Sequence, residues 1–143
     1  MKVDRFNTKK NNDPYSIINF KKTSSEIRNP DGTIVFSQPD VEVPESWSQV
    51  AADVLAQKYF RKAGIAKHLK KFPEKNVPEF LWRSIPDESK LSTLPLEKRF
   101  TGEKSCKEVF DRIAGAWAYW GWKGNYFDSE KDVKAYYDEM RYI

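Results

Sequence analysis

The side chains that most often carry out chemistry are scarce in this sequence. Among 143 residues there is one cysteine, Cys106, and one histidine, His68. A single thiol cannot form an internal disulfide, and one thiol with one imidazole is too few for a zinc site built from this chain alone. Cys106 lies beside Lys104 and Lys107, and neighbouring cations can lower a thiol pKa. Because no second thiol or recognisable base accompanies it, we expect Cys106 to be inert, and we expect His68 to be a solvated surface residue.

Other catalytic patterns are also missing. The sequence has no glycine-rich phosphate loop after a strand and no G-x-S-x-G elbow. Asp128, Glu130 and Asp132 cluster at an expected helix start, where the helix dipole stabilises negative charge. We therefore assign no catalytic, cofactor-binding or metal-binding residue to this chain.

Two stretches could instead bind a ligand or a partner. The first, "KYFRKAGIAKHLKK" (residues 58–71), holds six lysines and arginines and no acid. We favour a solvated helix face or connector over a phosphate site, because a basic run by itself has no binding geometry. The second, "GAWAYWGWKGNYF" (residues 115–127), has six aromatic residues. We favour a helix-pair core over a base-stacking platform, because only Lys123 is interleaved with the rings.

The composition is that of a folded, water-soluble domain. Hydrophobic residues make up 39% and charged residues 32% of the chain, and the formal net charge is +4. These values exclude a disordered chain and a membrane protein, and the modest positive charge permits contact with nucleotides. No secretion signal or apolar span is present, and the single cysteine fits a reducing compartment. We expect a cytoplasmic protein with no membrane partner.

The N-terminal half predicts a hairpin and a helix within a single domain over residues 15–143. Residues 1–14 are polar and predict a flexible arm. Residues 15–43 form the hairpin region, since "SSEIRNPDGTIVFS" places the turn formers Asn29-Pro30-Asp31-Gly32 between apolar clusters, and "YSIINFKK" before it could add a short strand. Residues 44–64 predict a helix, running from about 46 to 62 with Ser46 as its N-cap. The residues expected on one face of that helix are Trp47, Val50, Ala51, Val54, Leu55 and Phe60.

The second half predicts a connector and a pair of helices. Residues 65–104 hold four prolines and predict short turns joined by extended links, with Phe80, Leu81 and Trp82 as a packed anchor. Residues 105–143 predict a helical hairpin that continues beyond the last residue, because no stop signal follows its apolar pattern. The first helix is expected to start at the Ser105–Glu108 capping box and to end at Gly121, and the second is expected to be capped by Asp128 or Ser129. The residues expected on the buried face of the first helix are Val109, Phe110, Ile113, Ala114, Trp117 and Trp120. Those expected on the buried face of the second are Val133, Tyr136, Tyr137, Met140 and Ile143. The fold class is mainly α with a small N-terminal β-hairpin (α+β).

Three long segments resemble one family. "VEVPESWSQVAADVLAQKYFRKAGI", "VPEFLWRSIPDE" and "VFDRIAGAWAYWGWKGNYFDSEKDVKAYYDEMRYI" are similar, in order and spacing, to the N-terminal region of bacterial class II ribonucleotide reductases, which depend on adenosylcobalamin. The likeness runs from about Ser24 to Ile143. In the related motif "YWGWKGGYF" a glycine occupies the position of Asn125. Asparagine tolerates positive φ better than most residues, so the turn is expected to survive.

The resemblance implies a non-catalytic domain of a larger oxidoreductase. Family enzymes, of the ribonucleoside-diphosphate reductase type, convert ribonucleotides to deoxyribonucleotides for DNA replication through a cysteine thiyl radical in a ten-stranded α/β barrel. That chemistry needs at least three cysteines, and this chain has one. We expect the barrel, present in cis or as a split subunit, to be the partner of this chain. We expect the ribonucleotide to bind only through the barrel, and adenosylcobalamin to be bound by the full-length enzyme and not here.

Two alternatives remain open on the sequence. One is a free-standing module that binds nucleic acid through its basic and aromatic residues, although we expect no nucleic-acid partner. The other is an adaptor that binds a protein through the apolar stripe of its last helix.

Overall fold

The first large element is a long β-hairpin. In the computed structural model, which describes all residues from 1 to 143, β1 (Phe20–Arg28) pairs antiparallel with β2 (Ile34–Pro44). The turn is the predicted one: the Gly32 amide donates to the Asn29 carbonyl at 2.9 Å, and Gly32 has φ of +89°. A 3-10 turn (Pro14–Ile17) occupies the stretch before β1, so the strand expected there starts only at Phe20.

The helix expected over residues 44–64 is shorter than predicted. α1 (Gln49–Val54) begins after Ser48, whose hydroxyl accepts from the Ala51 amide, and a wider π-helical turn (Leu55–Tyr59) extends it. The predicted cap at Ser46 is wrong, because the chain is still bound to the hairpin region there: the Glu45 amide donates to the Asn19 carbonyl at 2.8 Å. The next residue, Ser46, therefore lies in a turn outside the helix.

The lower core lies where α1 packs on the hairpin. Its buried members are Val41, Val43, Ala52, Leu55, Ala56, Phe60, Cys106 and Val109. Val50 and Val54 were expected on the buried face but are exposed, because the hairpin covers the side of the helix that carries Ala52 and Ala56. The small side chains there allow the helix and strands to approach closely.

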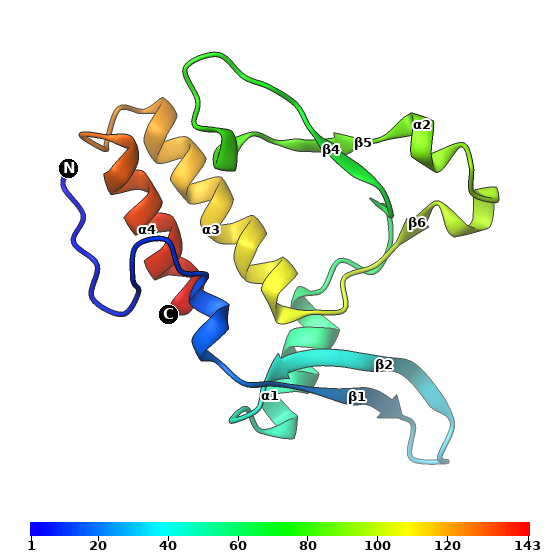
Figure 1. Cartoon of the computed structure of the whole chain (residues 1–143). Coiled ribbons are helices and arrows are strands. Elements are labelled where there is room, and N and C mark those ends of the chain that lie inside the picture. The colour runs from blue at the N-terminus through cyan, green and yellow to red at the C-terminus, as the bar shows by residue number, and fades with distance from the viewer.

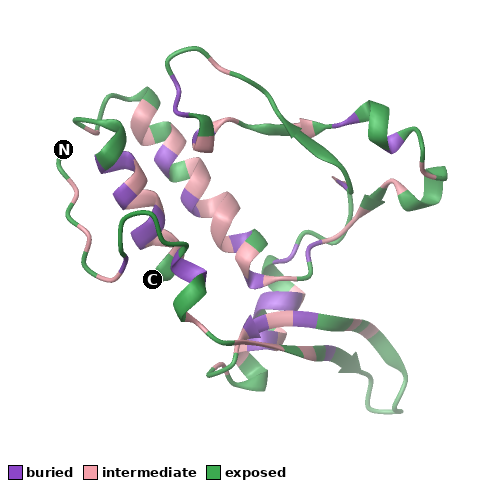
Figure 2. Ribbon diagram, in the orientation of Figure 1, coloured by how far each residue is buried: buried purple, intermediate pink, exposed green.

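Residues 61–104 form an open arch that begins after α1 (Figure 1). The arch passes beside the C-terminal end of the long helix α3 (Cys106–Lys123) and then returns to the N-terminal end of that helix. The predicted short elements are present, as antiparallel pairs of β3 with β6 and β4 with β5 and a short helix α2. Their bounds are β3 Ile65–Ala66, β4 Leu69–Lys71, β5 Ser84–Pro86, α2 Glu88–Leu91 and β6 Phe100–Thr101, with 3-10 turns at Glu79–Leu81 and Leu96–Lys98. Most of the arch and the hairpin tip are exposed (Figure 2).

The base of the arch is closed by one buried carboxylate. Glu103 is 1% exposed and accepts from the Arg61 amide at 2.8 Å and from the Arg112 Nε at 2.8 Å. Burial alone would raise the pKa of Glu103, but the hydrogen bonds from Arg112 and Arg61 hold it below its ordinary value. Glu103 thus joins both ends of the arch to α3.

Two antiparallel helices make the second layer. α3 (Cys106–Lys123) packs along α4 (Glu130–Tyr142) (Figure 1). The Ser105–Glu108 capping box is confirmed, and Ser129 caps α4. The predicted end of α3 at Gly121 is wrong, since the helix continues to Lys123. A Cβ on Gly121 would lie 2.5 Å from the Phe127 ring, so this glycine allows close packing instead of ending the helix.

The aromatic corner is only partly a core. Val77, Leu81, Ala118 and Val133 are buried there. Packed against them are Phe80, Trp82, Tyr119, Trp122, Phe127, Tyr136 and Tyr137, which confirms the predicted anchor. Trp117 and Trp120, however, are 49% and 65% exposed, against expectation. α3 faces its neighbours with its alanines, and the two tryptophans project from other sides of the helix.

The arm, which the sequence predicts to be flexible, makes defined contacts with α4 in this structure. Residues 1–13 lie along α4 (Figure 1), and α4 supplies buried acceptors for them. Asp132, Asp138 and Glu139 each accept hydrogen bonds from the arm. Ile143, expected on the buried face of α4, is 82% exposed.

Candidate functional site

The one thiol is unsuited to chemistry in this structure. Cys106 is fully buried in the lower core at the first turn of α3. Burial and, to a lesser extent, the nearby Glu42 carboxylate together raise the pKa of Cys106 to about 11, outweighing the opposite effect of Lys107. At neutral pH the group is a protonated thiol packed among apolar side chains, as expected for a structural cysteine.

The remaining titratable groups do not form a catalytic or metal cluster. His68 lies exposed on the arch, as expected. No group of three or more histidine, cysteine, aspartate or glutamate side chains is placed to hold a metal ion. Asp132 accepts from the Ser129 hydroxyl at 2.5 Å and from the Val3 amide at 3.0 Å, so it contacts the cap residue of α4 and tethers the arm.

The basic stretch of residues 58–71 is a connector, as predicted. Several of its cations are occupied within the chain: Arg61 binds Glu103, Lys62 donates to the Ala56 carbonyl, and Lys71 donates to the Trp82 carbonyl at 3.0 Å. Lys62 also lies over the Phe36 ring, 4.5 Å from its centroid. These contacts point in different directions, so the stretch forms no single phosphate-binding surface.

The structure does form a groove between α3 and the arch, of about 790 Å³. We call it the α3–arch groove. Its apolar walls include Ile65, Leu69, Phe80, Leu81, Tyr119 and Trp120. At its floor, Gly115 and Ala116 leave the α3 backbone thinly covered, which allows a partner to approach closely. Trp120 and Leu69 are exposed, so the groove is open to solvent.

Several polar groups around the groove already have partners. Arg61 and Arg112 are paired with Glu103. The Tyr119 hydroxyl donates to Glu74 at 2.9 Å, and this hydrogen bond raises the pKa of Tyr119. A groove with apolar walls and satisfied polar groups suits the docking of a protein surface better than the activation of a substrate.

Sequence reasoning did not find this groove. The aromatic residues were visible, but Trp120 was assigned to a buried stripe. The small pair Gly115-Ala116 was the available signal, because such a pair often marks a close approach. The arch residues that form the other wall carry no periodic pattern.

None of the helices is both long and apolar enough to cross a lipid bilayer.

Comparison with known proteins gives matches of one kind. A family model described as class II vitamin B12-dependent ribonucleotide reductase matches residues 21–143. The whole chain is 58% identical to a vitamin B12-dependent ribonucleotide reductase of Bradyrhizobium diazoefficiens and 54% identical to one of Agrobacterium fabrum. A similarly named protein of Streptomyces coelicolor is 25% identical over 99% of the chain. The chain spans about 11% of the length of each of these relatives.

Proposed function

This chain belongs to the class II vitamin B12-dependent ribonucleotide reductase family, as its N-terminal region, and from that premise we propose that it serves a full-length reductase as a non-catalytic packing domain. The reaction proposed for the whole enzyme is the reduction of ribonucleotides to deoxyribonucleotides by a thiyl radical. The observation that carries the non-catalytic role is the state of Cys106, a single buried thiol with a raised pKa.

The thiol requirement places the chemistry elsewhere in the enzyme. A thiyl radical and a reducing cysteine pair together need three thiols, and this chain offers one. Cys106 lies among Val43, Ala56 and Val109, where no substrate has access. The proposed division is therefore that other parts of the reductase, in an α/β barrel, supply the radical and the electrons.

The residues of this chain do not fit a cobalamin site. The only imidazole, that of His68, is exposed on the arch and does not line the α3–arch groove. The groove is bordered by ion pairs that are already satisfied, such as Arg112 with Glu103. We assign the cofactor to the rest of the enzyme and derive no step through it here.

The partner that we propose for the α3–arch groove is the rest of the same reductase. The relatives are about nine times longer than this chain, so most of the protein lies outside these 143 residues. An apolar groove with an exposed tryptophan matches the centre of a protein interface, where aromatic anchors lose contact with water. Its occupant would hold the arch and α3 in fixed relation.

Activity measurements test the non-catalytic role. The isolated chain, supplied with adenosylcobalamin, a dithiol and a ribonucleotide, is expected to form no deoxyribonucleotide. The full-length reductase carrying Cys106→Ala is expected to keep its turnover within about twofold, because the thiol only fills core volume and the cavity left by one sulfur is small.

Either of two results would overturn the proposal: deoxyribonucleotide formation by the isolated chain, or a folded full-length Cys106→Ala enzyme without activity. A matched control is full-length Val109→Ala, which also removes volume from the lower core. If both variants lose the same fraction of activity, the loss reflects packing and not the thiol.

A further inference from the structure

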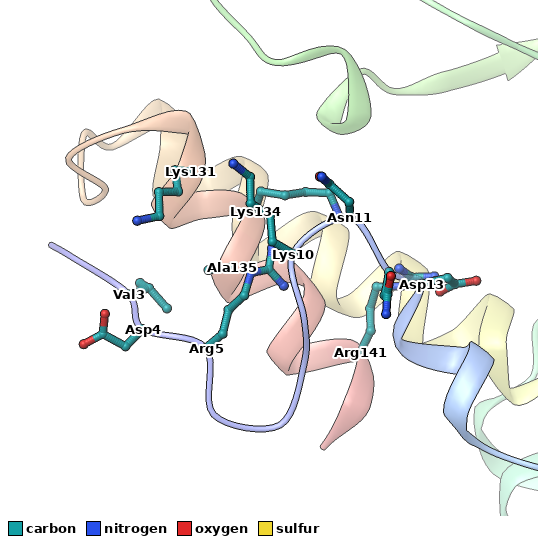
Figure 3. Close-up of a pocket in the computed structure, with 11 residues that line it drawn as sticks. Val3, Asp4, Arg5, Lys10, Asn11, Asp13, Lys131, Lys134, Ala135 and Arg141 are labelled. Carbon is teal, nitrogen blue, oxygen red and sulfur yellow. Dashed lines mark hydrogen bonds and ion pairs between the residues drawn. The ribbon is translucent and has the colours of Figure 1, made fainter.

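A second cavity, separate from the groove, lies between the arm and α4 (Figure 3) and has a volume of about 650 Å³. We call it the arm pocket. Its charged lining consists of five cationic side chains and two carboxylates, namely Arg5, Lys10, Lys131, Lys134, Arg141, Asp4 and Asp13. In Figure 3 the arm loops past α4, so that Arg5 and Lys10 approach from the arm while the other cations project from the helix. Cations outnumber carboxylates in this lining.

Three of these cations are held in place by one buried acid. Asp138 is 1% exposed and pairs with Arg5 at 2.8 Å, with Lys134, and with Arg141 at 3.8 Å. Arg141 also pairs with Asp13 at 3.2 Å and with Asp111 at 2.7 Å. The guanidinium groups are thus fixed before any ligand arrives.

The other two cations of the pocket are free. Lys10 and Lys131 take part in no ion pair and no hydrogen bond through their ammonium groups, although they line the same cavity. The side-chain amides of Asn11 and Asn12 add neutral donors at the same wall. Asp4 is the one lining carboxylate without a partner, so the free groups still favour an anion.

We propose that the arm pocket binds a polyphosphate group, with Lys10 and Lys131 contacting the phosphate oxygens. Ammonium groups bind phosphates through charge-assisted hydrogen bonds, and Lys10 and Lys131 are the two lining cations whose charge is not balanced by an ion pair. The cavity is much larger than one phosphate needs and falls within the size range of small-ligand sites. The ligand is therefore a chain of two or three phosphates, either free or carried by a nucleotide.

Binding there would be coupled to docking of the arm. Lys10 reaches the pocket only while the Glu139 carboxylate holds the backbone of Asn7 and Thr8 against α4. A ligand that binds only the docked arm stabilises that state in proportion to its concentration above its Kd. The site goes beyond the packing role proposed above, and neither depends on the other.

Calorimetric titration of the 143-residue chain with inorganic tripolyphosphate, in magnesium-free buffer of constant ionic strength, tests the proposal. We expect saturable one-site binding. Lys10→Gln and Lys131→Gln should each weaken it about tenfold, as expected for the loss of one charge-assisted hydrogen bond of about 1.4 kcal/mol. The matched control is Lys9→Gln, which removes the same charge from the neighbouring arm position but does not line the pocket. It should change the Kd less than about twofold.

Two outcomes would overturn the proposal: no saturable binding to the wild-type chain, or an equal loss in the Lys9→Gln control, which would indicate general charge attraction. A parallel titration with ATP distinguishes the two sources. Equal affinities identify the phosphate chain alone as the ligand, whereas tighter binding of ATP that is also lost in Lys10→Gln identifies a nucleotide. The second readout is the thermal midpoint, which at one tripolyphosphate concentration should rise more for the wild type and the control than for the pocket variants.

Discussion

Among single residues, Glu139 shows most clearly how a buried charge is stabilised in this molecule. Its carboxylate accepts from the Asn7 and Thr8 amides and from the Thr8 hydroxyl, at 2.6 to 3.1 Å. Burial alone would raise the pKa of Glu139, but these hydrogen bonds lower it to about 2. The ionised form is therefore the one that holds the arm.

The pH dependence of stability follows from this shift. The folded-state pKa of Glu139 lies below its ordinary value of 4.5, so its contribution is fully present above pH 4.5 and is lost as the pH falls toward about 2. The Glu139→Gln variant lacks this titration. We expect its free energy of unfolding to fall less steeply than that of the wild type between these two pH values.

Urea unfolding of both proteins across this pH range measures the difference. The wild type should be more stable near neutral pH, and the two curves should converge in acid. Parallel curves would show that Glu139 does not hold the arm through its charge.

Asn125 adopts the left-handed backbone conformation in the turn between α3 and α4. Its φ is +57°, a left-handed conformation in which asparagine and glycine are least strained. We expect Asn125→Gly to change the free energy of unfolding by less than about 0.5 kcal/mol, and Asn125→Val to lower it by about 1–2 kcal/mol. Chemical denaturation of the two variants tests this, and equal stability would contradict a backbone role.

At the level of elements, α3 contains two interior glycines with opposite roles. A Cβ on Gly115 would lie 3.8 Å from the Tyr137 ring, an ordinary contact, whereas a Cβ on Gly121 would lie 2.5 Å from the Phe127 ring. The Phe127 ring itself packs on Tyr136, with 5.3 Å between centroids, so it has little freedom to move away. The separation of α3 from the turn before α4 is set by this glycine.

Paired alanine substitutions on α3 distinguish the two positions. Gly115→Ala should stabilise the chain by about 0.5–1 kcal/mol, because alanine has the higher helix propensity. Gly121→Ala should destabilise it by about 1–3 kcal/mol through overpacking. Thermal unfolding of both variants is the measurement. A Gly121→Ala chain as stable as Gly115→Ala would show that the Phe127 ring rearranges without penalty.

For the whole molecule, the notable property is that the arch is fixed at its two ends and near its middle. At its base Glu103 binds Arg61 and Arg112, and a Cβ on Gly102 would lie 2.6 Å from the Lys62 carbonyl. Near its middle, Leu81 and its neighbours pack on α3. The span between these points encloses the α3–arch groove.

Glu103→Gln tests the closure of the arch. We expect a loss of about 1–3 kcal/mol, because the hydrogen bonds to two guanidinium groups lose their charge assistance. Glu74→Gln is the matched control: its pair with Lys123 is more exposed, so its loss of stability should be smaller than that of Glu103→Gln. Denaturation of both variants, together with protease cleavage within the arch, provides the comparison. Equal losses would contradict a special role for the arch base.

The proposed docking in the groove predicts a difference between two exposed tryptophans of α3. In the full-length reductase, Trp120→Ala should loosen this domain by at least about 2 kcal/mol, as expected for an aromatic anchor at an interface, whereas Trp117→Ala, outside the groove, should not. Release of the domain by limited proteolysis measures this. Similar release from both variants would place the interface elsewhere.

Local signals in the sequence determined the order and type of the elements. The Asn29–Gly32 turn, the Ser105–Glu108 capping box and the Ser129 cap lie within a few residues of their partners, so their hydrogen bonds follow from spacing alone. The family signature is equally local, since it consists of residues in order. These features were predicted and are present.

Tertiary structure decided which faces are buried and where the sites lie. Trp120 has the spacing of a core residue but borders an open groove, and Glu139 has the character of a surface residue but is buried under the arm. Each outcome depends on a segment far away in sequence, the arch in one case and the arm in the other. Periodicity reports only that a helix has an apolar side, because which side is covered depends on the packing of distant segments.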